Sequence, residues 1–190
     1  MKFKALAVAL ILAAGASLAG AQTTAWKFDP AHSSADFVIR HMGISNVHGH
    51  FGNVNGTVTL DEKDVTKSSV KAAVDTTTVD TGNGQRNSHL KSPDFFDVAK
   101  YPQMIFTSKQ IANKDGKLEL TGDLTLHGVT KSVTLDLDGP SKEIVDPKGV
   151  AHRGFSATTS IHRADFGLNY GNGILGDDVK VSLDVELIKQ

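Results

Sequence analysis

Strict alternation of apolar and polar residues is the feature that most constrains the fold of this chain. In "DVKVSLDVELIK", residues 178–189, Val or Leu occupies every second position from 179 to 187, and polar residues lie between them. A period of two puts successive side chains on opposite faces of a strand, so that one face is dry and the other is wet. "KLELTGDLTLHG" at 117–128 and "SVTLDLDG" at 132–139 repeat the pattern.

Further segments of this kind bring the total to about eight predicted strands. They are 34–42, 51–60, 68–76, 104–112 and 153–162. Turn sequences such as "NKDGK" at 113–117 and "HGVTK" at 127–131 separate several of them, which favours hairpins and antiparallel neighbours. Eight such strands can form a two-sheet sandwich or a barrel, and the pattern leaves both open. We favour the barrel, because closure removes exposed strand edges.

One interval interrupts the strands. Residues 82–102 are too long and too mixed in composition for a hairpin. Within them, "NSHLKSPDFFDVAKYP" at 87–102 predicts a short helical insertion, with Ser92 as its cap and Pro93 at a first helical position. The expected fold class is therefore all-β, an eight-stranded antiparallel barrel that carries this insertion.

The first 21 residues have the features of a secretory signal peptide. Lys2 and Lys4 form a basic start, an apolar run covers 5–14, and small Ala19 and Ala21 precede Gln22. We expect cleavage near Ala21–Gln22. A membrane anchor is the less favoured alternative, because the run is too short to span about 30 Å of hydrocarbon. The remaining residues, 22–190, suit a single domain.

Composition excludes several classes of protein. The chain has no cysteine, so it forms no disulfide and carries no lipid on a cysteine. Without Lys2 and Lys4, 18 basic residues face 21 acidic ones, a net charge of −3. This charge and the lack of a basic run argue against nucleic-acid binding. No second apolar stretch of about 20 residues follows, so we expect no integral membrane protein.

Enzymatic motifs are missing as well. The sequence contains no G-x-S-x-G elbow, no H-E-x-x-H, no P-loop and no G-x-G-x-x-G. Nothing in it brings a nucleophile and a base together. We therefore expect neither enzymatic activity nor a cofactor.

Four separated stretches carry a family resemblance. They are "FDPAHSSADFVIRHMGISNVHGHFGNVNGTV" at 28–58, "NSHLKSPDFFDVAKYPQMIF" at 87–106, "LTGDLTLHGVTKSV" at 120–133 and "RADFGL" at 163–168. Together they resemble the YceI family of bacterial periplasmic proteins, which are polyisoprenoid-binding-like. The resemblance implies a lipocalin-like barrel in the periplasm, whose tunnel holds an isoprenoid or a related amphiphilic lipid. Members are often dimers, so a homodimer stays open.

One position departs from the family pattern. Family members often show R-D-x-H-L where this chain has Arg86, Asn87, Ser88, His89 and Leu90. Asn87 supplies no carboxylate, which puts any role for a charge at this position in doubt.

The apolar face and the insertion provide the candidate ligand-binding residues. They are Phe37, Ile39, His41, Val58, Leu60, Val74, Leu90, Phe95, Phe96, Met104, Phe106, Leu120, Leu124, Leu135, Phe155, Ile161, Val181 and Leu183. Alternation also places Val70 and Val133 inward. The insertion could cover one end of the tunnel. The alternative is that these side chains fill a solid core, which the pattern alone does not distinguish from a hollow one.

Three histidines in "HMGISNVHGHF", residues 41–51, raise the question of a metal site. His48 and His50 lie two residues apart on one face, and His41 could join them across a turn to bind zinc or copper. The pattern letters of the family here are His41, Gly49 and Phe51, which leaves His48 and His50 at variable positions. We interpret the histidines mainly as rim residues and place no metal there. His41 is either a structural histidine with a fixed partner or a contact for the polar end of a ligand.

Arg163 and Asp165 match the family pattern R-x-DFG. We expect them to form a charge-assisted hydrogen-bond lock at the end of the barrel. The function predicted from all of this is a periplasmic carrier that holds a polyisoprenoid, an isoprenoid quinone or a similar lipid. Two alternatives stay open: a ligand-free barrel that binds a partner or responds to stress, and a histidine-based metal-binding protein.

Overall fold

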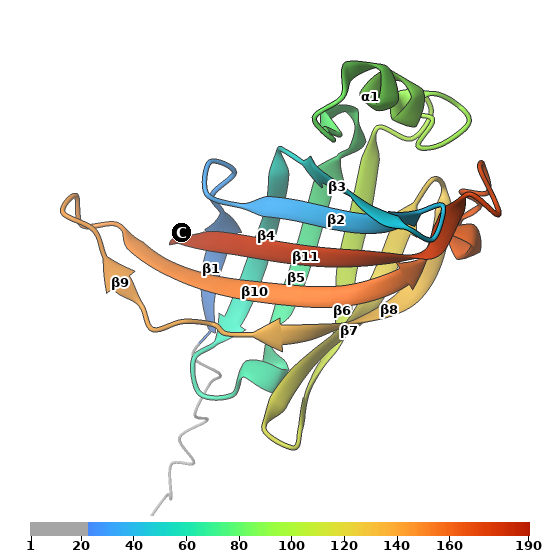
Figure 1. Ribbon diagram of the computed structural model, residues 1–190. Coiled ribbons are helices and arrows are strands. Elements are labelled where there is room, and N and C mark those ends of the chain that lie inside the picture. The colour runs from blue at the N-terminus through green and yellow to red at the C-terminus, as the bar shows by residue number, and fades with distance from the viewer. Residues whose placement is uncertain (1–22) are drawn as a thin grey trace, which may run out of the picture.

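Eight antiparallel strands form a closed ring in the computed structural model, which describes residues 23–190 (Figure 1). The order around the ring is β11-β1-β4-β5-β6-β7-β8-β10, and pairing of β10 with β11 closes it. The strands are β1 (Thr23–Phe28), β4 (Val54–Asp61), β5 (Ser69–Asp75), β6 (Gln103–Lys114), β7 (Lys117–Leu126), β8 (Val129–Asp138), β10 (Ala151–His162) and β11 (Leu175–Lys189). The expected eight-stranded antiparallel barrel is confirmed.

A hairpin outside the ring extends the wall at one end. It consists of β2 (Ser34–His41) and β3 (Ser45–Phe51), and β2 pairs with β11 along 175–184. The same edge of β11 pairs with β1 only at 187–189, so this edge has two partners in succession. A two-residue strand, β9 (Ile144–Val145), pairs with the start of β10.

The eight strands predicted from the sequence are therefore not the same eight that form the ring. The segment 34–42 was counted toward the eight, but it forms β2 outside the ring, whereas β1 was missed. The predicted strand 51–60 was also wrong at its start, because Asn53 has a φ of 50° and a turn separates β3 from β4.

Two of the predicted hairpin turns have the expected geometry. Asp115 and Gly116 join β6 to β7 with φ values of 52° and 83°, and His127 and Gly128 join β7 to β8 with 51° and 76°. Two successive positive φ angles are typical of the type I′ turn, whose twist matches that of the flanking strands. These turns fix the register of β6, β7 and β8.

The predicted helical insertion is present but begins earlier. Helix α1 (Gly84–Lys91) starts at Asn83, whose side chain accepts a hydrogen bond from the Arg86 N–H at 2.9 Å. Ser92 ends the helix instead of starting it, since its N–H donates to the carbonyl of His89. Three short 3₁₀ helices complete the elements: η1 (Val65–Lys67), η2 (Thr76–Thr78) and η3 (Arg163–Phe166).

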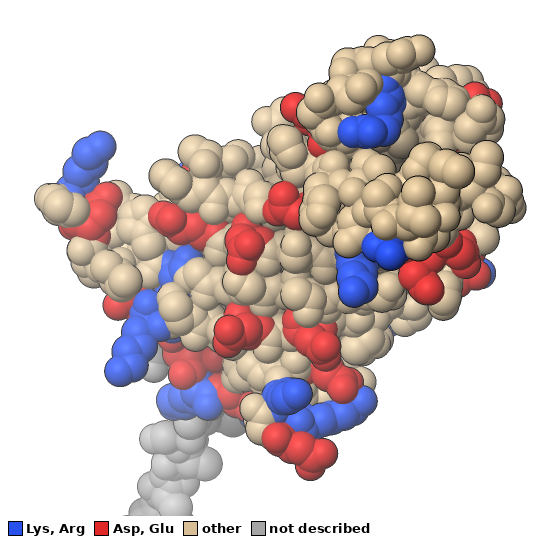
Figure 2. Space-filling view, in the orientation of Figure 1, with Lys and Arg blue, Asp and Glu red and all other residues tan. Residues whose placement is uncertain are grey.

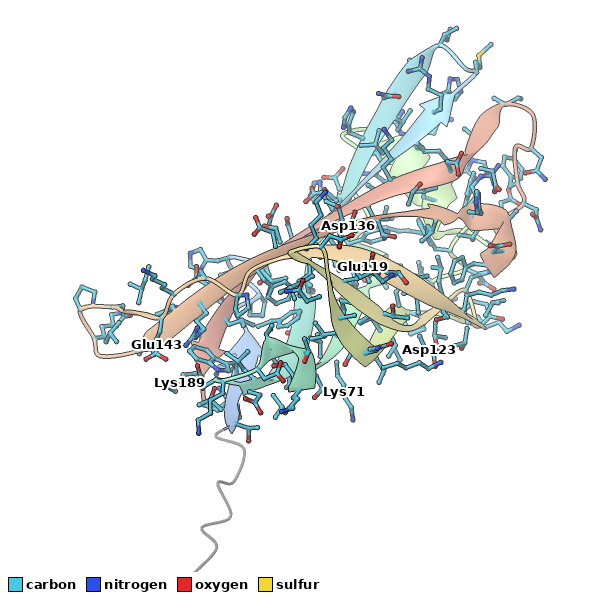
Figure 3. All side chains as sticks on the ribbon, turned by 90° about the horizontal axis from the view of Figure 1, so that it is seen from below. Lys71, Glu119, Asp123, Asp136, Glu143 and Lys189 are labelled. Carbon is cyan, nitrogen blue, oxygen red and sulfur yellow. The ribbon has the colours of Figure 1, made fainter. Side chains whose placement is uncertain are left out.

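One end of the barrel is filled by side chains. Trp26 is 1% exposed and packs with Val58, Leu60, Ile111 and Leu187. Cationic side chains cover its ring, because Arg153 and Lys189 each lie 5.4 Å from a ring centroid of Trp26. Lys189 also pairs with Glu143 at 3.0 Å, and Figure 3 shows these two side chains close together at this end. We call it the packed end.

The predicted signal peptide, residues 1–21, lies outside the described residues. Among residues 23–190, no helix is long and apolar enough to cross a membrane. Acidic and basic side chains are interspersed over the face of the barrel wall seen in Figure 2.

Candidate ligand-binding site

The interior of the barrel is hollow beyond the packed end. A cavity of about 620 Å³ lies between the strands, α1 and the loop that precedes β11. Ligand pockets in proteins typically measure about 300–1,000 Å³. The sequence left open whether the inward side chains fill a solid core or line a hollow one, and the structure shows a hollow interior.

Most of the candidate ligand-binding residues line the cavity. Every candidate residue except Val58 and Leu60 lines it, and so do Val70 and Val133. Val58 and Leu60 point inward but are 6% and 4% exposed within the packed end. The structure does not place these two predicted residues on the cavity, because the period of a strand tells which face a residue occupies and not how far along the barrel the packing extends.

Some lining residues were missed. Val179 and Val185 belong to the alternating stretch that defines β11 and could have been found there. Thr81 precedes α1, Arg86 lies on α1, and Tyr170 comes from the loop before β11, and none of these segments carries a periodic signal.

The cavity opens at the rim formed by the β2–β3 turn, α1 and the loop before β11. Tyr170 and Ile174 line the cavity and are 49% and 54% exposed, so the cavity reaches the surface beside them. A hydrogen bond joins the β2–β3 turn to the loop before β11, because the N–H of Met42 donates to the carbonyl of Ile174 at 2.6 Å. We call this region the rim.

Aromatic rings link α1 to the loop across the rim. The ring of His89 lies 5.0 Å from that of Phe95 and 4.9 Å from that of Tyr170, and Phe95 lies 5.1 Å from Tyr170. His89 Nε2 is 2.8 Å from Asp94 Oδ2, which fixes the imidazole. Edge-to-face pairs of this kind add to the stability given by buried area. The insertion therefore covers part of the opening, as the sequence suggested.

Polar groups are gathered at this rim. Arg86 donates from Nε to Thr81 Oγ1 and from Nη2 to Thr81 O, both at 2.8 Å. Asn87 accepts from the N–H of Thr81 at 2.9 Å and donates through Nδ2 to Asp80 Oδ1 at 2.8 Å. The amide of Asn87 thus acts both as hydrogen-bond donor and as acceptor, at the position where the family often has a carboxylate. Bonds from the Gly82 N–H and Asn87 lower the pKa of Asp80 below its usual value.

Arg163 forms a lock, but not with the predicted partner. Its guanidinium is buried and donates to the backbone carbonyls of Leu168, Gly176 and Tyr170, the last two at 2.9 Å. Asp165 is exposed. The predicted Arg163–Asp165 pair was wrong because residues two apart in a helical turn do not face each other. Arg163 instead holds the loop before β11 in place at the rim.

The three histidines do not converge on one ion. The register pairs His48 with Val38 and His50 with Asp36, so both lie on the outer face and are exposed. His41 follows Phe37 and Ile39 on the inner face and lines the cavity. Among residues 23–190 no side-chain hydrogen bond of His41 occurs, so the fixed partner expected for a structural histidine is not seen there, and contact with a ligand stays a prediction.

Comparison with known proteins agrees with this architecture. The sequence model of a family described as "YceI-like domain" matches residues 26–187. The protein named Protein YceI of Escherichia coli O157:H7 is 40% identical over 161 residues, which cover 84% of this chain and 83% of that protein.

Solved structures share the fold. BcnA of Burkholderia cenocepacia superposes with a TM-score of 0.72 at 24% identity, covering 84% of this chain and 98% of that one. A polyisoprenoid binding domain from Saccharophagus degradans, implicated in plant cell wall breakdown, gives 0.66 at 17% identity and covers 88% and 99%. At these identities the likeness concerns the fold alone. The family match over nearly all described residues, with 40% identity to Protein YceI, shows that this chain belongs to the YceI family.

Proposed function

We propose that the protein is a periplasmic carrier that holds a long apolar amphiphile, such as a polyisoprenoid or an isoprenoid quinone, inside the barrel. The observation that carries this proposal is the apolar cavity of about 620 Å³ with its polar residues gathered at one rim. An amphiphile would place its chain against the aliphatic wall and its polar end beside His41, Arg86 and His89. The polyisoprenoid binding domain among the structural neighbours supports the same class of ligand.

Burial of the chain alone gives enough free energy for retention. Each buried CH₂ contributes about 0.8 kcal/mol, so three or four isoprene units of five carbons contribute roughly 12–16 kcal/mol before costs. Lost translational and conformational freedom offsets a large part of this. Micromolar to nanomolar affinity is then reached without charged contacts, and selectivity depends mainly on the width and length of the chain.

The cavity holds a lipid without changing it chemically. Its wall is aliphatic and aromatic, and the side chains of Arg86 and Asn87 are engaged in hydrogen bonds that hold α1. Such a site suits storage or transfer of an unchanged lipid. The family membership is consistent with a binding protein.

The periplasmic location rests on the predicted signal peptide. Fractionation of a cell that expresses the full chain, with sequencing of the mature N-terminus, tests it. We expect periplasmic protein that begins at Gln22, and uncleaved protein in the cytoplasm would contradict the location but not the cavity.

Replacement of wall residues by charge tests the binding site itself. Phe106 and Leu124 form a cross-strand pair on the inner face of β6 and β7. Phe106→Asp or Leu124→Asp should abolish retention of lipid, because a carboxylate in an apolar cavity opposes burial of the chain. Thr107→Asp, on the outer face of β6, is the matched control and should retain lipid. Full retention by both folded inner variants would show that the ligand does not occupy this cavity.

A further inference from the structure

A second group of ionisable residues lies on the outer wall near the packed end, remote from the rim. Asp29 and His32 come from the β1–β2 turn, His152 from β10 and Glu186 from β11, while Asp146 belongs to the β9–β10 turn. We call these five residues the outer-wall cluster. It has no part in the lipid function proposed above.

Backbone pairing brings the cluster together. The N–H of Asp29 donates to the carbonyl of Glu186 at 2.8 Å, which holds the β1–β2 turn against β11. Val185 and Leu187 are buried inside the barrel, so the Glu186 side chain between them points outward. Glu186 pairs with Gly154 on β10, and His152 lies two residues away on the same face.

The polar atoms lie at separations suited to a shared cation. His32 Nδ1 is 2.8 Å from Asp29 Oδ2, and His152 Nδ1 is 2.7 Å from Glu186 Oε1. One ligand atom each from Asp29, His32 and Glu186 lies within 4.8 Å of the others. A tetrahedral zinc ion with ligands at about 2.0–2.1 Å separates neighbouring ligand atoms by roughly 3.3 Å. Shifts of about an ångström therefore bring the ligand atoms of Asp29, His32 and Glu186 to this spacing. His152 lies outside this group of three and joins it through its contact with Glu186, so its ring has to turn further to reach a shared ion.

The surroundings of His152 point to the same conclusion independently. Both of its ring nitrogens face carboxylates, because Nε2 lies 3.5 Å from Asp146 Oδ2. Nε2 is also buried and makes no hydrogen bond within residues 23–190. A neutral imidazole has one N–H and one lone pair, so a neutral His152 turns a lone pair toward one carboxylate. A cation at Nδ1 removes this repulsion and leaves the Nε2 proton for Asp146, the carboxylate–histidine–metal arrangement of many metal sites.

We propose that the outer-wall cluster binds a divalent transition-metal ion of the zinc class. His32, His152, Asp29 and Glu186 supply two nitrogens and two carboxylate oxygens, and Asp146 orients His152 from outside the coordination shell. Imidazole ligands favour zinc and its neighbours over Ca²⁺ and Mg²⁺, which prefer oxygen alone. The ion would tie the β1–β2 turn to β10 and β11.

Titration of the untagged, chelator-treated protein with Zn²⁺ alone tests this site. Calorimetry and native mass spectrometry should show one ion per chain. His32→Ala and His152→Ala should each weaken binding at least tenfold, and Asp146→Asn by about 10–100-fold, the usual effect of losing an outer-shell partner. The imidazole of His32 is 64% exposed, so that variant will fold normally. Co²⁺ in place of Zn²⁺ should give the visible absorption of a tetrahedral site.

A matched control uses two other exposed histidines. His48→Ala with His50→Ala on the outer face of β3 removes two imidazoles and should leave the affinity for Zn²⁺ unchanged. The proposal is overturned if no stoichiometric ion binds, if the His32→Ala/His152→Ala double variant binds as tightly as the parent, or if the His48 and His50 variants lose the ion instead.

Discussion

Asn87 is a single residue on which the position of α1 over the rim depends. Its amide nitrogen donates to Asp80 and its oxygen accepts from Thr81, so the side chain uses both halves of the amide. Asn87→Asp removes the donor and sets two carboxylates against each other. We expect local destabilisation of about 1–2 kcal/mol, measured as faster amide hydrogen exchange in α1.

The control for this change is Asn83→Asp, which adds the same charge to the same helix. An aspartate at the N-cap keeps the capping bond and is favoured by the helix dipole, so exchange in α1 should not accelerate. The local destabilisation of α1 by Asn87→Asp should also become smaller at acidic pH, where one of the two carboxyl groups, that of Asp80 or the new one, is protonated. Equal exchange in both variants would mean that Asn87 does not hold α1.

Gly122 makes room for the ring of Phe106 in the cavity wall. A Cβ at this position would lie 2.4 Å from the Phe106 ring and 2.5 Å from the carbonyl oxygen of Thr107. Gly122→Ala should therefore cost about 1–3 kcal/mol of unfolding free energy through overpacking. Gly84→Ala, where a Cβ meets nothing within 4 Å at the start of α1, should be neutral or stabilising in the same denaturant titration. No difference between the two variants would contradict the packing described for Phe106.

At the scale of the elements, the clearest sequence signals came from long strands with one dry face. β7, β8 and β11 were predicted from alternation, and the turns before β7 and β8 from glycine-containing turn sequences, whose central residues have positive φ in the structure. β3 was missed because its central inward position is Gly49, which leaves space for the Phe37 ring and breaks the apolar period. β1 was missed because a six-residue strand offers too few positions to show a period.

Asp75 caps the short helix η2, and its carboxylate makes the stability of this element depend on pH. Its carboxylate accepts hydrogen bonds from the hydroxyl and the N–H of Thr77, and the hydroxyl contributes most to a pKa below the usual value of 3.8. A lowered pKa stabilises the fold above pH 3.8, and this contribution is lost as the pH falls through the folded-state pKa.

Asp75→Asn should therefore lower stability at pH 7 by less than about 1 kcal/mol, since the group is partly exposed. The difference in melting temperature between parent and variant should narrow below pH 3.8. A difference that is constant between pH 7 and pH 3 would show that the charge of Asp75 has no role.

For the whole molecule, the sequence predicted a closed barrel but not how far its interior is filled. Alternation assigns side chains to the inner face, whereas filling depends on which large residues meet along the axis. Trp26 fills one end, and Phe95, Phe96 and Tyr170 stay at the other end without filling the middle. The rim could not be predicted, because Arg86 reaches it from α1 and Tyr170 from the loop before β11, and Arg163 holds that loop through backbone carbonyls.

Occupancy of the cavity by a lipid can be measured on the purified protein. The protein is purified without detergent, its mass is determined by native mass spectrometry, and an organic extract of the same sample is analysed for lipids. We expect one isoprenoid-type molecule or similar long amphiphile per chain in the parent and none in Phe106→Asp. Recovery of ligand-free protein alone, even after incubation with such lipids, would contradict the carrier function and favour a barrel that binds a protein partner.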